Sequence, residues 1–216
     1  MYQKLLNALN AHHVALVAVS KTQPPERVLD LYRQGQRIFG ENRAQELIAK
    51  AEKLPPDIAW HLIGHLQTNK VKIVVPLVSM IQSVDSLRLL EEIERQAANV
   101  GRVLDCLLQF HIAGEETKFG LNEEEGYALL NSPEYRGMTN VRICGVMGIA
   151  TFTDDVEQVR REFKHLRTIF DTLRAGYFQD ATHFREISMG MSSDWQIAVE
   201  EGSTMVRIGS LIFGER

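Results

Sequence analysis

The chain has 216 residues, of which 44% are hydrophobic and 24% are charged, which is typical of a folded globular protein and excludes a disordered one. Its 24 Lys and Arg residues against 28 Asp and Glu leave a formal net charge of −4 without blocks of like charge, so we expect no nucleic-acid partner. The N-terminus lacks the pattern of a signal peptide, and no apolar run is long enough to span a membrane. We therefore expect a cytoplasmic protein with one domain over residues 1–216.

Short apolar runs rich in Val, Ile and Leu alternate with longer amphipathic stretches along the chain. In chain order, the eight runs cover residues 13–20, 37–42, 58–64, 77–83, 102–112, 141–149, 183–188 and 204–209. Because the runs are continuously apolar and do not alternate with polar residues, they predict parallel strands that are buried on both faces.

The stretches between these runs have the three- and four-residue apolar spacing of helices, and a short helix is also expected at the N-terminus. The clearest stretch begins at Val156 and continues through Phe163 to Leu173, with Thr153 and Asp154 as N-cap candidates. Eight strand–helix pairs predict an α/β fold, a (β/α)8 TIM barrel, with a doubly wound open sheet as the alternative. In such a barrel the carboxyl ends of the strands form the functional face.

Lys21 directly follows the first apolar run, which is the most apolar of the chain. A lysine at the mouth of an apolar barrel is partly desolvated, which favours the neutral amine and makes it a nucleophile for aldehydes. Alternatively, the side chain extends along the apolar surface and keeps its charged end in water. Lys21 is therefore a candidate for Schiff-base formation.

Small and hydroxyl-bearing residues follow the seventh and eighth predicted strands, in the segments SMGMSSD and VRIGS. Backbone N–H groups at helix starts bind phosphate, and the loops after these two strands form the recurrent phosphate site of this barrel. Ser188, Gly209 and Ser210 are accordingly candidate phosphate ligands, although a structural role is equally open. For Ser192 and Ser193 we expect capping of the following helix.

Two further polar residues lie at predicted strand ends. Arg207 ends a buried strand, where an unpartnered cation is costly, so it either pairs with a carboxylate or faces a ligand atom. Asn42 has Gln45 three residues later, which is the spacing of a capping box and predicts a helix N-cap.

The sequence contains no convincing metal or redox motif. His61 and His65 have the four-residue spacing of helical metal ligands, but their segment is predicted to be a strand that runs into a loop, so the two rings should point in different directions. Cys106 and Cys144 lie far apart in apolar segments, and we expect two buried, reduced thiols. No metal is expected.

Several motifs together resemble the pyridoxal phosphate (PLP) homeostasis protein family, whose barrels are related to the N-terminal domain of alanine racemase. The motifs are VSKTQP, FGEN, WHLIGHLQTNK and SMGMSSD followed by GSTMVRIG, in this order, and the resemblance extends from about Val14 to Arg216. It implies that PLP is the cofactor, bound as a Schiff base on Lys21, with Asn42 beside the ring and Arg207 facing the pyridine nitrogen. It also implies that Ser188, Gly209 and Ser210 hold the phosphate.

The loop after the fifth predicted strand, FHIAGEETKFG, departs from the common pattern of this family. His111 stands where Asn often follows the strand, and Phe119 stands where a small residue often precedes the glycine. The departure affects the cover over the ring and leaves the cofactor contacts unchanged.

The cation at Arg207 restricts the chemistry that the resemblance implies. A guanidinium facing the pyridine nitrogen keeps that nitrogen unprotonated, so the ring becomes a poor electron sink. Racemisation also needs a proton carrier on each face of the substrate carbon. In the racemases one of these is a tyrosine from a second domain of the partner subunit, and this chain ends soon after its eighth strand–helix unit.

We therefore expect a PLP-binding protein with no catalytic residues and without robust turnover. The resemblance implies a role in vitamin B6 and amino-acid homeostasis. One alternative is a weak PLP-dependent amino-acid racemase, and another is an interaction protein whose partner senses the cofactor. A monomer is expected, since no racemase dimerisation domain follows the barrel.

Overall fold

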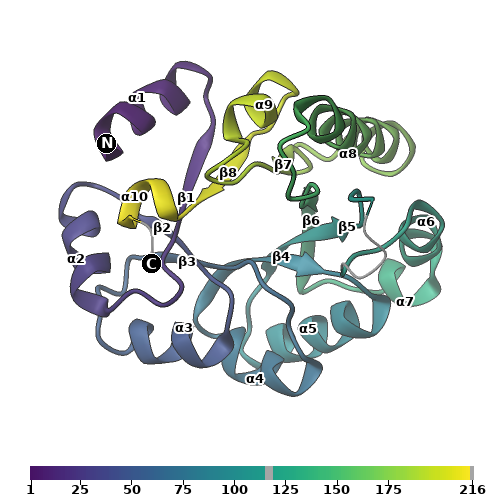
Figure 1. Ribbon diagram of the computed structural model, residues 1–216. Coiled ribbons are helices and arrows are strands. Elements are labelled where there is room, and N and C mark those ends of the chain that lie inside the picture. Colours follow the sequence, from purple (N-terminus) through teal and green to yellow (C-terminus); the bar gives the residue numbers. More distant parts are fainter. Residues whose placement is uncertain (115–118, 215–216) are drawn as a thin grey trace.

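Eight parallel strands close into a barrel in the computed structural model, which describes residues 1–114 and 119–214 (Figure 1). The strands are β1 (Ala15–Val19), β2 (Ile38–Glu41), β3 (Ala59–Leu62), β4 (Val78–Val84), β5 (Leu104–Phe110), β6 (Val141–Gly148), β7 (Glu186–Ser188) and β8 (Met205–Ile208). Each strand pairs with the next in parallel, and β8 pairs back with β1. This closure confirms the predicted (β/α)8 barrel and excludes the open sheet.

The helices form a ring outside the strands (Figure 1). They are α1 (Tyr2–Ala11), α2 (Pro25–Arg33), α3 (Ala44–Ala51), the 3-10 helix η1 (Thr68–Lys70), α4 (Val71–Val74), α5 (Leu87–Asn99), α6 (Glu123–Asn131), α7 (Pro133–Arg136), α8 (Val156–Tyr177), α9 (Trp195–Glu200) and α10 (Ser210–Phe213). Helix α10 is a single turn. The predicted N-terminal helix α1 lies in the outer ring between α9 and α2. There it takes the place of a long helix after β8.

Helix α8 shows why the amphipathic pattern predicts a helix. Its buried residues are Val159, Glu162, Phe163, Leu166, Ile169, Phe170 and Leu173. All but one are apolar, and they recur at spacings of three and four that place them on one face of the helix. Each fully buried large apolar side chain contributes about 1.5–3 kcal/mol. The N-cap is Asp155, whose carboxylate accepts from Gln158 N, and the predicted caps Thr153 and Asp154 lie two residues and one residue earlier.

The two cysteines are buried and are not joined to each other, as expected. Burial raises the pKa of the Cys144 thiol to about 12, which keeps it protonated and unreactive. Cys144 belongs to a small apolar cluster with Val17, Leu107 and Met205, which fills the barrel interior. Among the helices of the described residues, none combines the length and apolar character needed to cross a bilayer.

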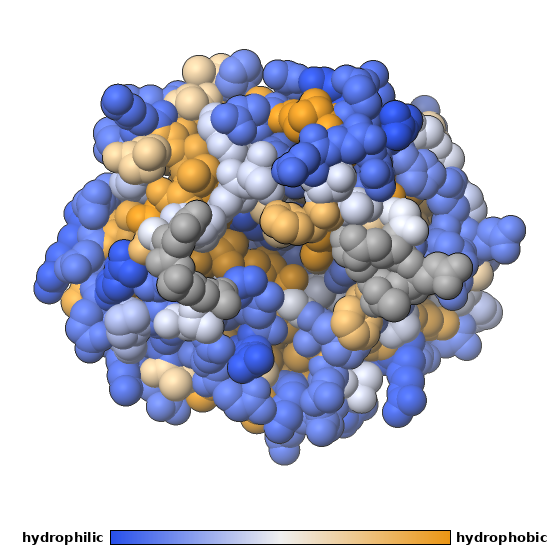
Figure 2. Space-filling model, viewed as in Figure 1, coloured by the Kyte–Doolittle hydropathy of each residue, from blue (hydrophilic) through white to orange (hydrophobic). Residues whose placement is uncertain are grey.

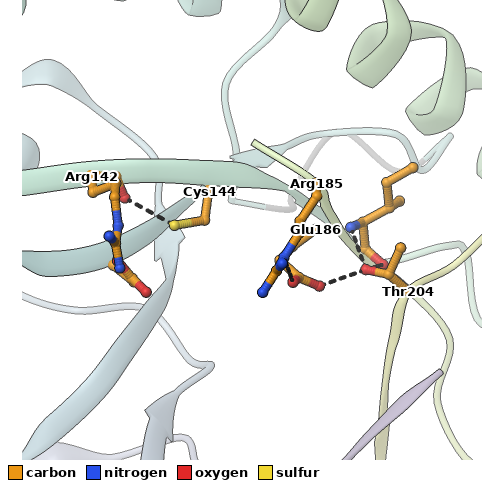
Figure 3. Close-up of polar contacts among 7 residues, drawn as sticks. Arg142, Cys144, Arg185, Glu186 and Thr204 are labelled. Atoms are coloured by element: carbon orange, nitrogen blue, oxygen red, sulfur yellow. Dashed lines mark hydrogen bonds and ion pairs between the residues drawn. The ribbon is translucent and has the colours of Figure 1, made fainter. Parts of the chain in front are cut away.

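Strands β7 and β8 share fewer residues in register than any other neighbouring pair of the barrel. Ser188 and Met205 are their single pair in register, whereas all three residues of β7 pair with β6. Side chains supplement the pairing: Thr204 Oγ1 donates to Glu186 Oε2 over 2.7 Å and accepts from Ile187 N over 2.8 Å (Figure 3). The Thr204 hydroxyl thus adds to the backbone hydrogen bonds of this seam, in which Thr204 N donates to Ile187 O over 3.0 Å and Met189 N donates to Met205 O over 3.1 Å.

Candidate functional site

A cavity of about 530 Å³ opens at the carboxyl ends of the strands, within the size range of small-molecule sites. Figure 2 shows the same face, where apolar residues gather around a central hollow and hydrophilic residues surround them. The residues predicted from sequence that line the cavity are Lys21, Asn42, Arg207, Gly209 and Ser210. The fold therefore brings together, at one opening, five residues that are spread over most of the chain.

Lys21 lies in a tight turn immediately after β1 and is half-buried in the cavity wall. The next residue, Thr22, has a φ of 64°, a left-handed conformation that a β-branched residue rarely adopts. Two hydrogen bonds hold the turn: Thr22 N donates to Glu46 Oε2 over 2.8 Å, and Gln23 N donates to Ser20 O over 3.0 Å. The turn thereby fixes the backbone that carries the lysine.

A buried ion pair lies behind this turn, and sequence reasoning missed it. Glu41, at the end of β2, is fully buried, and its Oε1 accepts from Ser20 Oγ over 2.6 Å and from Lys50 Nζ over 2.5 Å. Lys50 Nζ also donates to Ser20 O over 2.6 Å. Burial raises the pKa of Glu41, while the hydrogen bonds from Lys50 and Ser20 act in the opposite direction. The pair ties the ends of β1 and β2 to α3.

Asn42 does not cap a helix, contrary to the expectation from its spacing to Gln45. The N-cap position of α3 is Arg43, without a side-chain cap. The Asn42 side chain instead lines the cavity, and it makes no hydrogen bond to the described part of the protein. Its backbone is crossed closely by the loop after β3, where a Cβ on Gly64 would lie 2.4 Å from Asn42 O. Glycine is therefore required at position 64.

Ser192 and Ser193 also do not cap the following helix as expected. The N-cap position of α9 is Asp194, whose Oδ1 accepts from Met191 N over 2.5 Å and closes a turn. This turn leaves both serines on the cavity wall. The error arose because Ser and Asp are nearly equivalent as cap residues, so the sequence could not choose among three adjacent candidates.

The loops after β7 and β8 meet at one side of the cavity. Gly209 N donates to Ser192 Oγ over 3.4 Å and so links the two segments. Several backbone N–H groups have no acceptor within the described residues, namely those of Ser192, Ser193, Ser210 and Leu211. A cluster of unpartnered N–H groups is suited to an anion such as phosphate.

Arg207 lines the cavity although it is only 4% exposed. Its Nη1 donates to Ser188 O and to Ser188 Oγ, both over 2.7 Å, and its Nη2 donates to Gly148 O over 2.9 Å. Of the two alternatives drawn from the sequence, pairing with a carboxylate is absent from its described hydrogen bonds, and Nε has no acceptor among these residues. Burial lowers the pKa of Arg207 to about 10, so the side chain remains a cation at neutral pH.

Ser188 lies below the cavity and not on its wall. The side chain is fully buried, and its hydroxyl accepts from Arg207 and donates to Gln82 Oε1 over 2.7 Å. With the hydroxyl used in both directions, this arrangement does not support the expected contact with phosphate. The alternation of inward and outward side chains along a strand could not predict these hydrogen bonds, because Ser188 ends β7 where the strand turns into a loop.

The two histidines point in different directions, as predicted for a strand that runs into a loop. His61 is buried on β3 with its Nδ1 at 2.8 Å from Gln82 Nε2, whereas His65 Nδ1 lies 3.0 Å from Asp85 Oδ2 at the barrel mouth. Across the described residues, no group of three or more His, Cys, Asp or Glu side chains could hold a metal ion.

The fold is a (β/α)8 barrel with a cavity at the carboxyl ends of its strands. Residues 2–216 match the family described as alanine racemase, N-terminal domain, and the chain belongs to this family. Within that family it belongs to the pyridoxal phosphate homeostasis proteins. It is 42% identical over 203 residues to the protein of that name from Aquifex aeolicus, covering 93% of this chain and 86% of the relative. The Homo sapiens protein is 41% identical over 211 residues, covering 93% and 76%.

Solved structures agree with this assignment. PipY of Synechococcus elongatus with PLP bound is 37% identical, with a TM-score of 0.84 over 98% of this chain and 99% of that one. Alanine racemase of Clostridium difficile in complex with cycloserine has a TM-score of 0.77 at 14% identity, covering 98% of this chain and 58% of that one. At that identity, the likeness to the racemase concerns the fold alone.

Proposed function

We propose that the cavity binds PLP and that Lys21 holds its aldehyde as a Schiff base. The observation that carries the proposal is that a primary amine, a set of unpartnered N–H groups and a buried guanidinium line one cavity. These three groups match the aldehyde, the phosphate and the ring nitrogen of PLP. The names of the relatives, and the PLP bound to PipY, support the same ligand.

Each end of the cavity has a distinct task in this proposal. The N–H groups around Gly209 and Ser210, with those of the Ser192–Ser193 turn, hold the phosphate dianion. Asn42 has an unpartnered amide on the cavity wall and lies beside the ring. Ser188 contributes indirectly, since its hydroxyl contacts the arginine and not the cavity.

We further propose that the protein holds PLP without robust turnover. PLP supplies an electron-withdrawing ring when its nitrogen is protonated. The Arg207 guanidinium remains charged at neutral pH and offers only N–H donors, so it opposes protonation of a nitrogen that faces it. A site of this kind favours storage and release of the cofactor, in keeping with a role in vitamin B6 and amino-acid homeostasis.

Reduction with borohydride, followed by peptide mapping, tests the site. PLP-saturated protein should carry the reduced pyridoxyl group on Lys21, and Lys21→Ala should abolish the label. Lys53→Ala, in the exposed turn after α3, should retain it. An unmodified Lys21 peptide from saturated wild-type protein would refute the proposed site.

Hydrogen exchange tests the absence of turnover. The loaded protein is incubated with L-amino acids in deuterated water, and exchange at the α-carbon is followed by mass spectrometry. Little exchange over many hours is expected. Rapid exchange with loss of chirality would identify an amino-acid racemase.

A further inference from the structure

A chain of hydrogen bonds crosses the barrel interior and ends at Arg207. Arg207 Nη1 on β8 lies 2.7 Å from Ser188 Oγ at the end of β7, and Ser188 Oγ lies 2.7 Å from Gln82 Oε1 on β4. Gln82 Nε2 in turn lies 2.8 Å from His61 Nδ1 on β3. The side chains therefore join strands on opposite sides of the barrel below the cavity.

The direction of every hydrogen bond in this chain follows from Arg207. A guanidinium can only donate, so Ser188 Oγ accepts from it and must donate its own hydrogen to Gln82 Oε1. The amide group of Gln82 then faces His61, so His61 Nδ1 must accept. The chain is consistent only with a neutral imidazole that carries its hydrogen on Nε2.

Burial makes this chain costly unless it is complete. His61 is 5% exposed, and Gln82 and Ser188 are fully buried. Apolar side chains, among them Met80 and Met205, occupy the same interior. Unpaired polar groups in such surroundings cost free energy, whereas a complete network specifies one arrangement of its members.

We infer that Ser188, Gln82 and His61 are positioning residues that fix the Arg207 guanidinium at the buried side of the cavity. The inference rests on the proposed function, in which that guanidinium faces the pyridine nitrogen. Through this chain, a histidine remote from the cavity wall determines how the arginine presents its remaining N–H groups. Burial also lowers the pKa of His61 to about 4, which agrees with a neutral acceptor at physiological pH.

The first test needs no cofactor, and it uses a substitution only to assign the signal. In the apo protein labelled with ¹⁵N-histidine, the nitrogen shifts of His61 should show an unprotonated Nδ1 and a protonated Nε2 at pH 7, with assignment by loss of the signal in His61→Gln. A protonated Nδ1 would reverse the Gln82 amide, deprive Ser188 of its acceptor and overturn the inference.

The second test breaks the chain at its centre. Gln82→Met keeps the length of the side chain and removes the amide, and Gln96→Met is the matched control because Gln96 is also buried but lies on α5 outside the barrel. With PLP labelled with ¹⁵N in the ring, the pyridine nitrogen shift should change in Gln82→Met and remain as in wild type in Gln96→Met. We expect PLP affinity to fall roughly three- to tenfold in Gln82→Met only.

The outcomes separate this inference from the proposed function. If borohydride labels Lys21 in the wild type but Gln82→Met leaves both the nitrogen shift and the affinity unchanged, the positioning role is wrong while the cofactor site stands. If Gln82→Met does not fold, Ser188→Ala interrupts the same chain next to the arginine, and the same two measurements decide. If wild-type protein does not bind PLP, the proposed function fails, and the ¹⁵N-histidine measurement still decides whether the chain exists.

Discussion

The ring of Phe119 stacks on the ring of His65, with centroids 4.3 Å apart and planes inclined by 17°. Phe119 belongs to the loop after β5, and His65 belongs to the loop after β3, where its Nδ1 also contacts Asp85 Oδ2 at 3.0 Å. Asp85 directly follows β4, so the His65 imidazole links three loops at the barrel mouth, those after β3, β4 and β5. The phenylalanine that departs from the common pattern of the family thus has a definite partner, whereas residues 115–118 of the same loop lie outside the described residues.

Removing this stack should destabilise the mouth. Phe119→Ala is expected to lower the free energy of unfolding by about 1 kcal/mol, because aromatic pairs contribute roughly 0.5–1.5 kcal/mol beyond the area they bury. Urea unfolding measures the change. Phe152→Ala is the control, since Phe152 is 84% exposed at the same mouth and makes no ring contact among the described residues. Equal losses in both variants would show that the stack contributes nothing.

The charge at Arg207 should determine the spectrum of bound PLP. Arg207→Gln keeps hydrogen-bonding capacity and removes the cation that opposes protonation of the ring nitrogen. We expect the absorption of the loaded variant to change with pH as the ring nitrogen titrates, whereas the wild-type spectrum stays constant over the same range. A titration followed by absorbance makes the comparison, and identical profiles would argue that the guanidinium does not face the nitrogen.

Breaking the buried ion pair should be costly. Lys50→Met leaves Glu41 without its cation, and the loss of one partner of a buried pair typically costs about 3–5 kcal/mol. The double variant Glu41→Gln with Lys50→Met should recover part of this loss, because no buried charge remains. A double-mutant cycle measured by urea unfolding, with Lys53→Met as the exposed control, tests both expectations. Additive effects would mean that the two side chains do not interact.

Glu162 should make the free energy of unfolding depend on pH. Burial raises the pKa of its carboxyl, but hydrogen bonds from Thr151, Gln158 and Gly114 outweigh it, so the pKa is lowered. Since the pKa is lower in the folded state than in the unfolded one, the stabilisation is complete above about pH 4.3, the unfolded value, and is lost as the pH falls through the folded pKa.

Urea midpoints of wild type and Glu162→Gln, measured from pH 7 to pH 3, check this sign. The variant should be less stable at pH 7, and the difference should shrink as the pH falls. Glu157→Gln, at an exposed position in the first turn of α8, should follow the wild-type profile. A difference that grows on acidification would contradict the direction of the shift.

Local patterns were sufficient to predict the barrel because its strands and helices are encoded by short-range periodicity. The continuous apolar run before Lys21 and the three- and four-residue spacing from Val159 to Leu173 each specify one element without reference to the others. The N-cap of α8 was misplaced because Thr153, Asp154 and Asp155 can all cap a helix. Only the backbone dihedral angles decide among such neighbours.

The site was predictable in part. Their positions at predicted strand ends selected Lys21 and Arg207, the motif resemblance supplied their expected roles, and the fold brings both to one cavity. The contact of Glu41 with Lys50 depends on how a strand end meets a neighbouring helix, and no short-range rule indicates such a pair. The hydrogen bonds of the Ser188 hydroxyl depend on Gln82, which lies 106 residues away in the sequence. The role of this hydroxyl could therefore be assigned only from the folded chain.

The short register of β7 with β8 has a thermodynamic consequence for the cavity. The Ser192–Ser193 turn follows β7, and Gly209 and Ser210 follow β8, so an anion held by both would bridge the two strands just above their single pair in register. A ligand that binds the closed barrel, but not a form in which β7 and β8 have separated, stabilises the closed barrel by mass action. A bound anion would therefore hold β7 and β8 together. Amide hydrogen exchange in these two strands would then slow more on ligand binding than exchange in any other strand.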